Sequence, residues 1–508
     1  MSQLDVLFIE PNSSGEAYQE LSHSYSAIET PTWALLLAQS CRSKGYGVGI
    51  LDCVAERLSI GESAARIRSI NPKLVVFVMY GQNPNSGTVN MIGACKLGKL
   101  LKDNYPDYPI CMVGTHVSAL PKEVLGYPFV DFVLLNEGVY ALHNLLKTNL
   151  IDKLDKVKGI GYKIKGVGVL NEPESVVPQE RMDIDLPGYA WDLLPYKNKP
   201  LDLYRSHFWH SEFNHNKRTP FAAIYTSLGC QYKCNFCVIN IVNRVDNGDN
   251  VVSSDSRGMR FWSPEFITRE FEKLASMGVE TVRISDEMFF LNKRYFEPLL
   301  TNIASMGHKF NMWAYSRVDT VQDKYLDLFK KAGINWLALG IESANQNIRL
   351  EITKGNFKDV NIRDVVGKVR GHGLNVISNY IFGFPDDTIE TMGQTLALAL
   401  ELNTETANMY PCQALPGSPL HLQARKNGWK LPESFEGYAF LSYDSQPLET
   451  KHCSPAEVLD FRDKAWSTYF RNPEYLKLVE NKFGEQQRKN LEEMSNVKLK
   501  RKILGHKL

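Results

Sequence analysis

Three cysteines in one short segment carry the clearest chemical signal in the sequence. Cys230, Cys234 and Cys237 are separated by three and then by two residues. Three thiolates can bind three irons of a cubane iron–sulfur cluster and leave the fourth iron open to a ligand from outside the protein. A fourth cysteine would close the site and indicate structure or simple electron transfer. The spacing therefore predicts a cluster with one open iron, where chemistry can occur.

Two other uses of these cysteines are less well supported. A disulfide with a spare thiol would need an oxidising compartment, but residues 1–9 resemble the start of a buried strand and not a signal peptide. A structural zinc site would need a fourth Cys or His at a usual spacing, which the neighbouring sequence does not offer. The other six cysteines are scattered singly, so the cluster is the favoured interpretation.

Length and composition limit the classes of protein that fit. A chain of 508 residues with 44% hydrophobic content is expected to form two or three domains. A formal net charge of +1 gives no electrostatic reason to expect nucleic acid or a membrane surface as a partner. No apolar run reaches the roughly 18 residues that a transmembrane helix needs. We therefore expect a cytoplasmic protein without nucleic-acid or membrane partners.

The N-terminal part alternates between strand and helix patterns. Apolar segments of strand length occupy residues 6–9, 48–51, 74–79, 110–113 and 130–134, and helix patterns occupy 33–44 and 89–101. Strands without polar alternation, separated by helices, predict a doubly wound parallel sheet whose ligands bind beyond the carboxyl ends of its strands. A dinucleotide is not favoured, because no Gly-x-Gly-x-x-Gly follows the first strand and Gly159-Ile-Gly161 lies in a predicted hairpin, 157–169.

The middle of the chain predicts a second α/β unit. After an aromatic linker, strands are expected at 222–226, 281–284, 309–315, 336–339, 376–381 and 407–410, and helices at 264–277, 323–332, 362–372 and 389–402. Six such βα units form a partial TIM-type barrel with its chemistry at the carboxyl ends of the strands. The cysteine segment is the first of these loops, and polar groups recur at the later strand ends.

The C-terminal part differs from both units. Ser454 and Pro455 predict the start of a helix. Residues 486–508 are charged, and we expect a solvated helix or a frayed tail there, with Lys498, Lys500, Arg501 and Lys502 serving solubility.

Residues 52–56, 114–121 and 131–138 resemble the cobalamin-binding domains attached to radical S-adenosylmethionine (SAM) enzymes. The cobalamin signature Asp-x-His-x-x-Gly is incomplete, since Val54 stands where the cobalt-ligating His would be. The resemblance thus implies cobalamin without a histidine on cobalt, with His116 as a pocket residue. It implies a cobalamin pocket formed by Asn12, Ser86, Gly114, Thr115, His116, Ser118, Asn136, Glu137 and Gly138.

Residues 221–425 are similar to the radical SAM superfamily in the order of their motifs. The resemblance implies that the open iron of a [4Fe-4S] cluster binds SAM and that reduction yields a 5′-deoxyadenosyl radical. It places Phe236 near the adenine and Gly383 where the chain approaches it closely, and it makes Asp286, Arg317, Glu342 and Ser343 candidates for holding SAM. Ser285-Asp286-Glu287 replaces the family's Gly-Gly-Glu, so the ligand of the SAM amino group is either Asp286 or a backbone carbonyl.

Together these resemblances divide the chain into a cobalamin-binding domain (1–150), a hairpin and aromatic linker (151–217), a radical SAM partial barrel (218–425) and a C-terminal region (426–508). They imply methylation of an unactivated carbon, or of phosphorus, in a small-molecule substrate, through a substrate radical and methylcobalamin. Flavodoxin or ferredoxin is the expected electron donor. The alternatives are a rearrangement, ring contraction or oxidative cyclisation without methyl transfer, and a non-catalytic cobalamin or cluster sensor.

Overall fold

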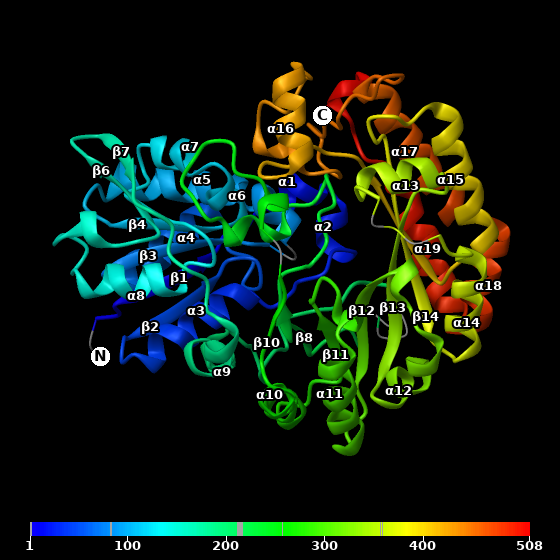
Figure 1. Cartoon of the computed structure of the whole chain (residues 1–508), viewed down its shortest axis with the longest axis horizontal. Coiled ribbons are helices and arrows are strands. Elements are labelled where there is room, and N and C mark those ends of the chain that lie inside the picture. Colours follow the sequence, from blue (N-terminus) through cyan, green and yellow to red (C-terminus); the bar gives the residue numbers. More distant parts are fainter. Residues whose placement is uncertain (1–2, 82–83, 211–216, 257, 356, 358) are drawn as a thin grey trace.

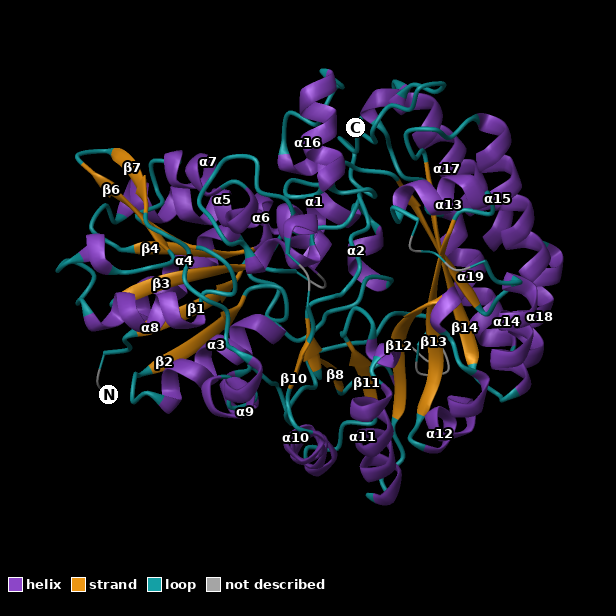
Figure 2. Cartoon of the chain, viewed as in Figure 1, coloured by secondary structure: helices purple, strands orange, loops and turns teal. Residues whose placement is uncertain are grey.

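The computed structural model describes residues 3–508 except 82–83, 211–216, 257, 356 and 358. Two sheets lie side by side, with the N-terminal sheet at the left of Figure 1 and the second sheet at the right. Helices flank both sheets, and helices α1 (Ser14–Tyr18) and α2 (Leu21–Ser24) lie in the middle of the view between them (Figure 2). In the described part of the chain, no helix is long and apolar enough to cross a membrane.

The N-terminal sheet has seven strands in the order β2-β1-β3-β4-β5-β6-β7. Its first five strands are parallel, as predicted, and the predicted hairpin adds two antiparallel strands at one edge. The strands are β1 (Val6–Glu10), β2 (Val48–Asp52), β3 (Leu74–Met79), β4 (Ile110–Gly114), β5 (Phe132–Leu134), β6 (Ile160–Ile164) and β7 (Val167–Leu170). Every residue of β3 is buried, which explains its unbroken apolar sequence.

Helices cover both faces of this sheet. Alternate residues of the strands pack with α3 (Thr32–Ser43) and α8 (Val139–Lys147) on one face. The other residues pack with α4 (Ile60–Ile70), α5 (Gly87–Asn104) and α7 (Pro121–Gly126) on the opposite face. The short helix α6 (Thr115–Ala119) follows β4 directly. Parallel strands buried on both faces confirm the predicted doubly wound domain.

The second sheet consists of six parallel strands in the order β15-β14-β13-β12-β11-β8. They are β8 (Phe221–Ile224), β11 (Thr281–Ile284), β12 (Asn311–Arg317), β13 (Ile334–Glu342), β14 (Asn375–Phe382) and β15 (Thr406–Pro411). The connecting helices are α10 (Pro264–Ser276), α11 (Lys293–Ser305), α12 (Leu326–Lys331), α13 (Gln346–Ile352), α14 (Ile362–Gly371) and α15 (Ile389–Leu402). The partial barrel is confirmed. Helices α11 and α13 were not predicted: Pro298 lies inside α11, and α13 has only seven residues.

A small antiparallel pair, β9 (Ser227–Leu228) and β10 (Arg260–Phe261), brackets the cysteine segment. Four helices follow the barrel: α16 (Pro419–Asn427), α17 (Pro455–Phe470), α18 (Pro473–Phe483) and α19 (Glu485–Asn496). Ser454 caps α17 in a capping box with Glu457, as its sequence predicts.

The expectation of a solvated helix or frayed tail after residue 486 was wrong. Helix α19 buries Leu491 and Met494, and the side chain of Arg501 is fully buried in an ion pair with Asp463. Gln19 of the segment after α1 bonds to the backbone of Lys500. The last residues therefore pack against the rest of the chain, because an ion-pair partner for Arg501 lies 38 residues upstream.

Candidate functional site

A cavity of about 900 Å³ lies where the carboxyl ends of the two sheets meet. Its wall includes residues at the ends of β1, β12, β13 and β15, together with loops, the linker and the C-terminal region. Both parallel sheets thus turn their ligand-binding edges toward one space.

The cysteine loop forms part of this wall. Cys230, Cys234 and Cys237 all line the cavity. The backbone N–H of Cys230 donates to Asn240 Oδ1 at 3.1 Å, and Asn240 Nδ2 donates to the carbonyl of Cys230 at 2.8 Å. Gly229 has a φ of +85°, and a Cβ there would come within 2.5 Å of the Gly258 carbonyl oxygen. The fold of the loop therefore requires this glycine.

The three thiols fit an iron–sulfur cluster. Burial raises the pKa of Cys230 to about 12 and that of Cys234 to about 11, and it also raises the pKa of Cys237. Bound iron keeps such sulfurs deprotonated, because metal coordination removes the proton of a thiol. Among the described residues, no three Cys, His, Asp or Glu side chains converge on a single-ion site. One thiolate per iron, on one cavity wall, suits a cluster.

Three of the predicted SAM contacts lie on the same wall as the cysteines: Phe236, Arg317 and Glu342. The Arg317 guanidinium lies 3.9 Å from the ring centroid of Tyr232 and pairs with Asp319 at 2.6 Å. Burial raises the pKa of Glu342 to about 7, although Arg317 opposes this change. Glu342 also has a φ of +64°, a strained conformation of the kind that gathers at functional sites.

The other three predicted SAM contacts lie behind the wall. Both carboxylate oxygens of the buried Asp286 accept hydrogen bonds from Thr226 and Ser227, just before the cysteine loop. Ser343 is buried beside Thr395. A Cβ on Gly383 would meet Val458 of α17 at 2.4 Å. Their contacts to SAM stay a prediction.

Sequence reasoning missed Glu287, which lines the cavity next to the buried Asp286. Burial raises its pKa to about 8, although Arg283 opposes this rise. Its Oε1 has no hydrogen-bond partner within the described part of the chain. Neighbouring residues at a strand exit point in opposite directions, so a motif match alone could not tell which carboxylate faces the cavity.

On the cobalamin side, Val54 and the predicted contact Ser86 line the cavity, together with Glu10 at the end of β1. Val54 therefore faces the shared space at the position where a cobalt-ligating histidine would stand. Burial raises the pKa of Glu10 well above its usual range. Val54 and Ser86 are small side chains near the ends of parallel strands, which leaves room for a large ligand at this edge.

The remaining predicted cobalamin contacts lie deeper in the domain or at its border. Asn12 folds its own loop by accepting from Ser14. A Cβ on Gly114 would lie 2.2 Å from the Met79 carbonyl oxygen. The residues that follow it in α6 are all buried: Thr115, His116 and Ser118.

The buried His116 ring in this helix has a hydrogen-bond partner at only one of its two nitrogens. Its Nδ1 lies 3.0 Å from Thr88 Oγ1, and its Nε2 has no partner in the described structure. Burial lowers the pKa of His116 to about 3, so the ring is neutral. A neutral buried ring is consistent with a pocket residue, which stays a prediction.

Asn136 and Glu137 connect the N-terminal domain to the barrel. Glu137 pairs with Arg260 of β10 at 2.8 Å, and Asn136 exchanges hydrogen bonds with the backbone of Arg244. Gly138, with a φ of +79°, begins α8. Whether these residues also reach cobalamin stays a prediction.

A second connection between the domains lies inside the cavity and escaped sequence reasoning. Glu29 of the N-terminal domain pairs with Arg283 of β11, and their side chains are only 4% and 2% exposed. His207 of the linker lies 3.0 Å from the other oxygen of Glu29. Burial favours protonation of Glu29, but Arg283 and His207 outweigh it and hold the Glu29 pKa below its usual range.

Comparison with known proteins agrees with both halves of the chain. The radical SAM superfamily model matches residues 224–399, and the B12 binding domain model matches residues 21–146. An uncharacterized methyltransferase of Pyrococcus horikoshii is 26% identical over 88% of this chain and 89% of its own length. The anaerobic magnesium-protoporphyrin IX monomethyl ester cyclase of Cereibacter sphaeroides is 22% identical over 90% of this chain and 68% of its own length.

The fold is similar to that of the radical SAM methyltransferase TsrM from Kitasatospora setae, solved with tryptophan and a SAM analogue. The TM-score is 0.65 at 17% identity, covering 97% of this chain and 98% of TsrM. Two family models in this order, over a shared cavity lined by three cysteines, identify both cofactor domains. The chain therefore carries a radical SAM domain and a B12-binding domain, and the cofactors that these two domains take are a [4Fe-4S] cluster, SAM and cobalamin.

Proposed function

We propose that this enzyme transfers a methyl group to an unactivated carbon, or to phosphorus, of a small molecule. The observation that carries the proposal is one continuous cavity lined by the three cysteines and by Val54. A radical made beside the cysteines and a methyl group presented near Val54 would reach the same substrate without its release.

When bound, the cluster supplies the electron that splits SAM, and cobalamin carries the methyl group. Arg317 offers a fixed cation to the SAM carboxylate, and Glu342, on the same wall, offers oxygens to its ribose hydroxyls. Val54 leaves the neighbouring face of the cobalamin site without a histidine. The surrounding apolar side chains keep water from the radical, which reacts with whatever it meets.

The relatives support this proposal because several are named methyltransferases, and TsrM was solved with tryptophan as substrate. The cyclase relative keeps oxidative cyclisation as a second candidate. The Glu29–His207 pair favours that candidate, because converting a substrate radical to an unsaturated product removes a proton and an electron; an imidazole held by a carboxylate can accept the proton, and the oxidised cluster would take the electron when bound. Flavodoxin or ferredoxin would supply the electrons in either case.

Anaerobic turnover with methyl-labelled SAM tests the proposal. We expect the reduced holoenzyme to form 5′-deoxyadenosine and to move label into the cobalamin fraction and then into product. Deoxyadenosine without label in either fraction would favour oxidative cyclisation, and neither product would indicate a sensor.

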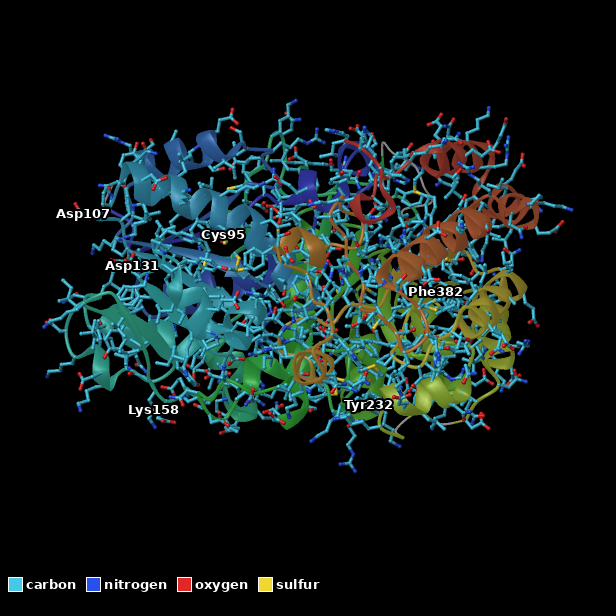
Figure 3. All side chains as sticks on the ribbon, turned by 90° about the horizontal axis from the view of Figure 1, so that it is seen from above. Cys95, Asp107, Asp131, Lys158, Tyr232 and Phe382 are labelled. Atoms are coloured by element: carbon cyan, nitrogen blue, oxygen red, sulfur yellow. The ribbon has the colours of Figure 1, made fainter. Side chains whose placement is uncertain are left out.

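A matched pair of cysteine variants completes the test. Cys234→Ala should abolish deoxyadenosine formation, because one iron loses its ligand. Cys95→Ala should retain it, since Cys95 in α5 lies in the N-terminal half while Tyr232 of the cysteine loop lies in the other half (Figure 3).

A further inference from the structure

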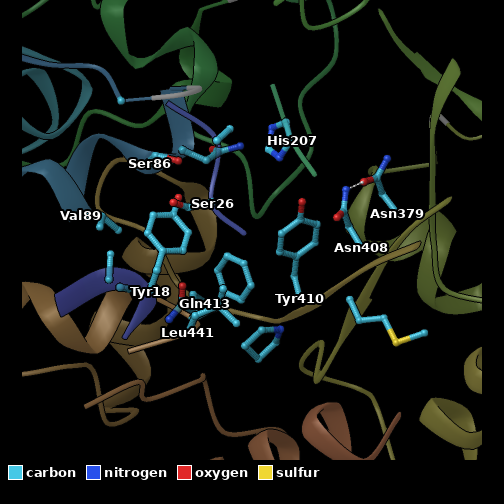
Figure 4. Close-up of a pocket in the computed structure, with 18 of the residues that line it drawn as sticks. Tyr18, Ser26, Ser86, Val89, His207, Asn379, Asn408, Tyr410, Gln413 and Leu441 are labelled. Carbon is cyan, nitrogen blue, oxygen red and sulfur yellow. Dashed lines mark hydrogen bonds between the residues drawn. The ribbon is translucent and has the colours of Figure 1, made fainter. Parts of the chain in front are cut away.

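A row of neutral polar side chains lines the barrel side of the cavity. Asn379 of β14 and Asn408 of β15 are directly paired in register, and Tyr410 lies two residues further along the same face of β15. Asn408 Nδ2 donates to Asn379 Oδ1 at 2.9 Å, and Asn379 Nδ2 donates to the Leu339 carbonyl at 3.2 Å (Figure 4).

These bonds use only part of what the amides offer. Each side-chain amide has two N–H donors and an oxygen that accepts twice. Within the described chain, Asn408 Oδ1 receives no donor, and both residues are half-buried on the cavity wall. The pair therefore presents an acceptor and N–H donors side by side to whatever occupies this space.

Aromatic rings surround the amide row. Trp313 and Tyr315 of β12 line the cavity, with ring centroids 4.9 Å apart. Tyr18, Tyr410 and His207 come from α1, β15 and the linker and surround the same space in Figure 4. Rings on several sides favour a flat ligand that can stack or make edge contacts.

Two of the arginines that line the cavity already have carboxylate partners. Arg283 pairs with Glu29 and also donates to the Tyr315 hydroxyl at 2.9 Å. Arg462 of α17 pairs with Asp463 at 2.8 Å. At Arg283 and Arg462 an anionic substrate group would have to compete with these carboxylates, whereas an uncharged polar group at the amide row would meet amides and phenols that can hydrogen-bond to it.

The size of the cavity limits the ligand further. Pockets of about 300–1,000 Å³ take one drug-sized molecule. The cavity of about 900 Å³ must also take part of SAM beside the cysteines and part of cobalamin beside Val54. The space left for a substrate is therefore smaller than the whole cavity, which favours a small ring system over a tetrapyrrole macrocycle.

We propose that the substrate is an uncharged, planar heteroaromatic or lactam ring, held by its donor–acceptor edge on Asn379 and Asn408. Tyr410 and the rings of Trp313 and Tyr315 enclose it. This inference rests on the proposed function, since it assigns the substrate class of the same cavity.

Binding of 2-quinolinone to the reconstituted, unreduced holoenzyme with SAM tests the inference. This bicyclic lactam carries its N–H and C=O on one edge, and 2-naphthyl phosphate is an anionic ring of similar size for comparison. By anaerobic calorimetry we expect the lactam to bind more tightly than the phosphate and than protoporphyrin IX. Asn408→Ala should weaken lactam binding at least tenfold, and Asn335→Ala should leave it unchanged, because Asn335 lies near the start of β13 and pairs with Asn311.

Four results would overturn the inference. They are no lactam binding up to its solubility limit, tighter binding of the phosphate or of the macrocycle, equal lactam affinity in Asn408→Ala, and an equal loss of SAM affinity in that variant. The last would assign the amides to SAM. Methyl label in the cobalamin fraction is measured on the same preparation without substrate, so failure of the proposed function is distinguishable from failure of this inference.

Discussion

Arg501 anchors the end of the chain, and its removal should release that end from the cavity. Its side chain is fully buried and pairs with Asp463 through Nε at 2.8 Å and Nη2 at 2.9 Å. Its Nη1 donates to the carbonyls of Phe440 and Ser442 at 3.0 and 2.8 Å. Val497, Leu504 and His506 around it line the cavity.

The magnitude follows from the burial of Arg501. Removing one partner of a buried ion pair costs about 3–5 kcal/mol, and the low end applies here because Asp463 is 26% exposed and keeps its pair with Arg462. That free energy corresponds to a rise of about 100-fold or more in local opening of the C-terminal segment, at 1.4 kcal/mol per factor of ten. We therefore expect Arg501→Ala to speed amide hydrogen exchange over residues 497–508 by that factor, and to weaken substrate binding with little effect on SAM cleavage.

Lys502→Ala is the matched control, because Lys502 is the exposed neighbour whose ion pair with Asp444 lies at the surface. Surface pairs contribute about 0–1 kcal/mol, so exchange should change less than about fivefold. If Arg501→Ala and Lys502→Ala exchange alike, the buried pair does not hold the segment and the reasoning fails.

Three further outcomes are expected. Val54→His should place an imidazole nitrogen on cobalt and give nitrogen superhyperfine splitting in the electron paramagnetic resonance spectrum of the reduced cobalamin, whereas Val54→Leu should not. The wild-type spectrum in both variants would show that Val54 does not face cobalt. Burial raises the pKa of Asp52 to about 6, so between about pH 4 and pH 6 this carboxyl is protonated in the folded state but ionised in the unfolded state, and the free energy of unfolding falls as the pH rises through this range. Asp52→Asn should flatten that part of the plot of melting temperature against pH. An unchanged slope would contradict the assignment to Asp52. Glu29→Gln should lower the melting temperature by several degrees, because Arg283 stays buried without its counterion. Glu20→Gln, which changes an exposed residue, should leave the melting temperature unchanged. Equal melting curves for the two variants would argue against the buried pair.

The elements that a local pattern specifies could be predicted from the sequence. The cysteine loop, the two sets of parallel strands and the capped start of α17 each depend on residues within a few positions of one another. The sequence could not show that Glu287, and not Asp286, faces the cavity, because both carboxylates belong to the same motif. Hydrogen bonds from Thr226 and Ser227 hold Asp286 away from the cavity, and these are tertiary contacts.

Partners distant in sequence account for the other differences. Glu29 and Arg283 are 254 positions apart, and nothing near either residue indicates the other. Arg501 looked like one of several solubilising charges, and only its burial against Asp463 distinguishes it from Lys500 and Lys502. Charged residues that bury themselves through remote partners leave no periodic signal in the sequence.

The origin of each cavity wall explains why the cofactors are easier to assign than the substrate. The cysteine loop lies within the segment that matches the radical SAM model, and Val54 lies within the B12-binding match. Asn408, Tyr410 and the C-terminal residues around Arg501 lie beyond both matches but line the same space. Binding of the shared cofactors depends on strand ends inside the two matches, whereas part of the proposed substrate site, including Asn408 and Tyr410 of β15, lies outside them. Relatives with the same cofactors would therefore act on different molecules, and we expect this chain to select its substrate at the pair formed by Asn379, inside the radical SAM match, and Asn408, outside it.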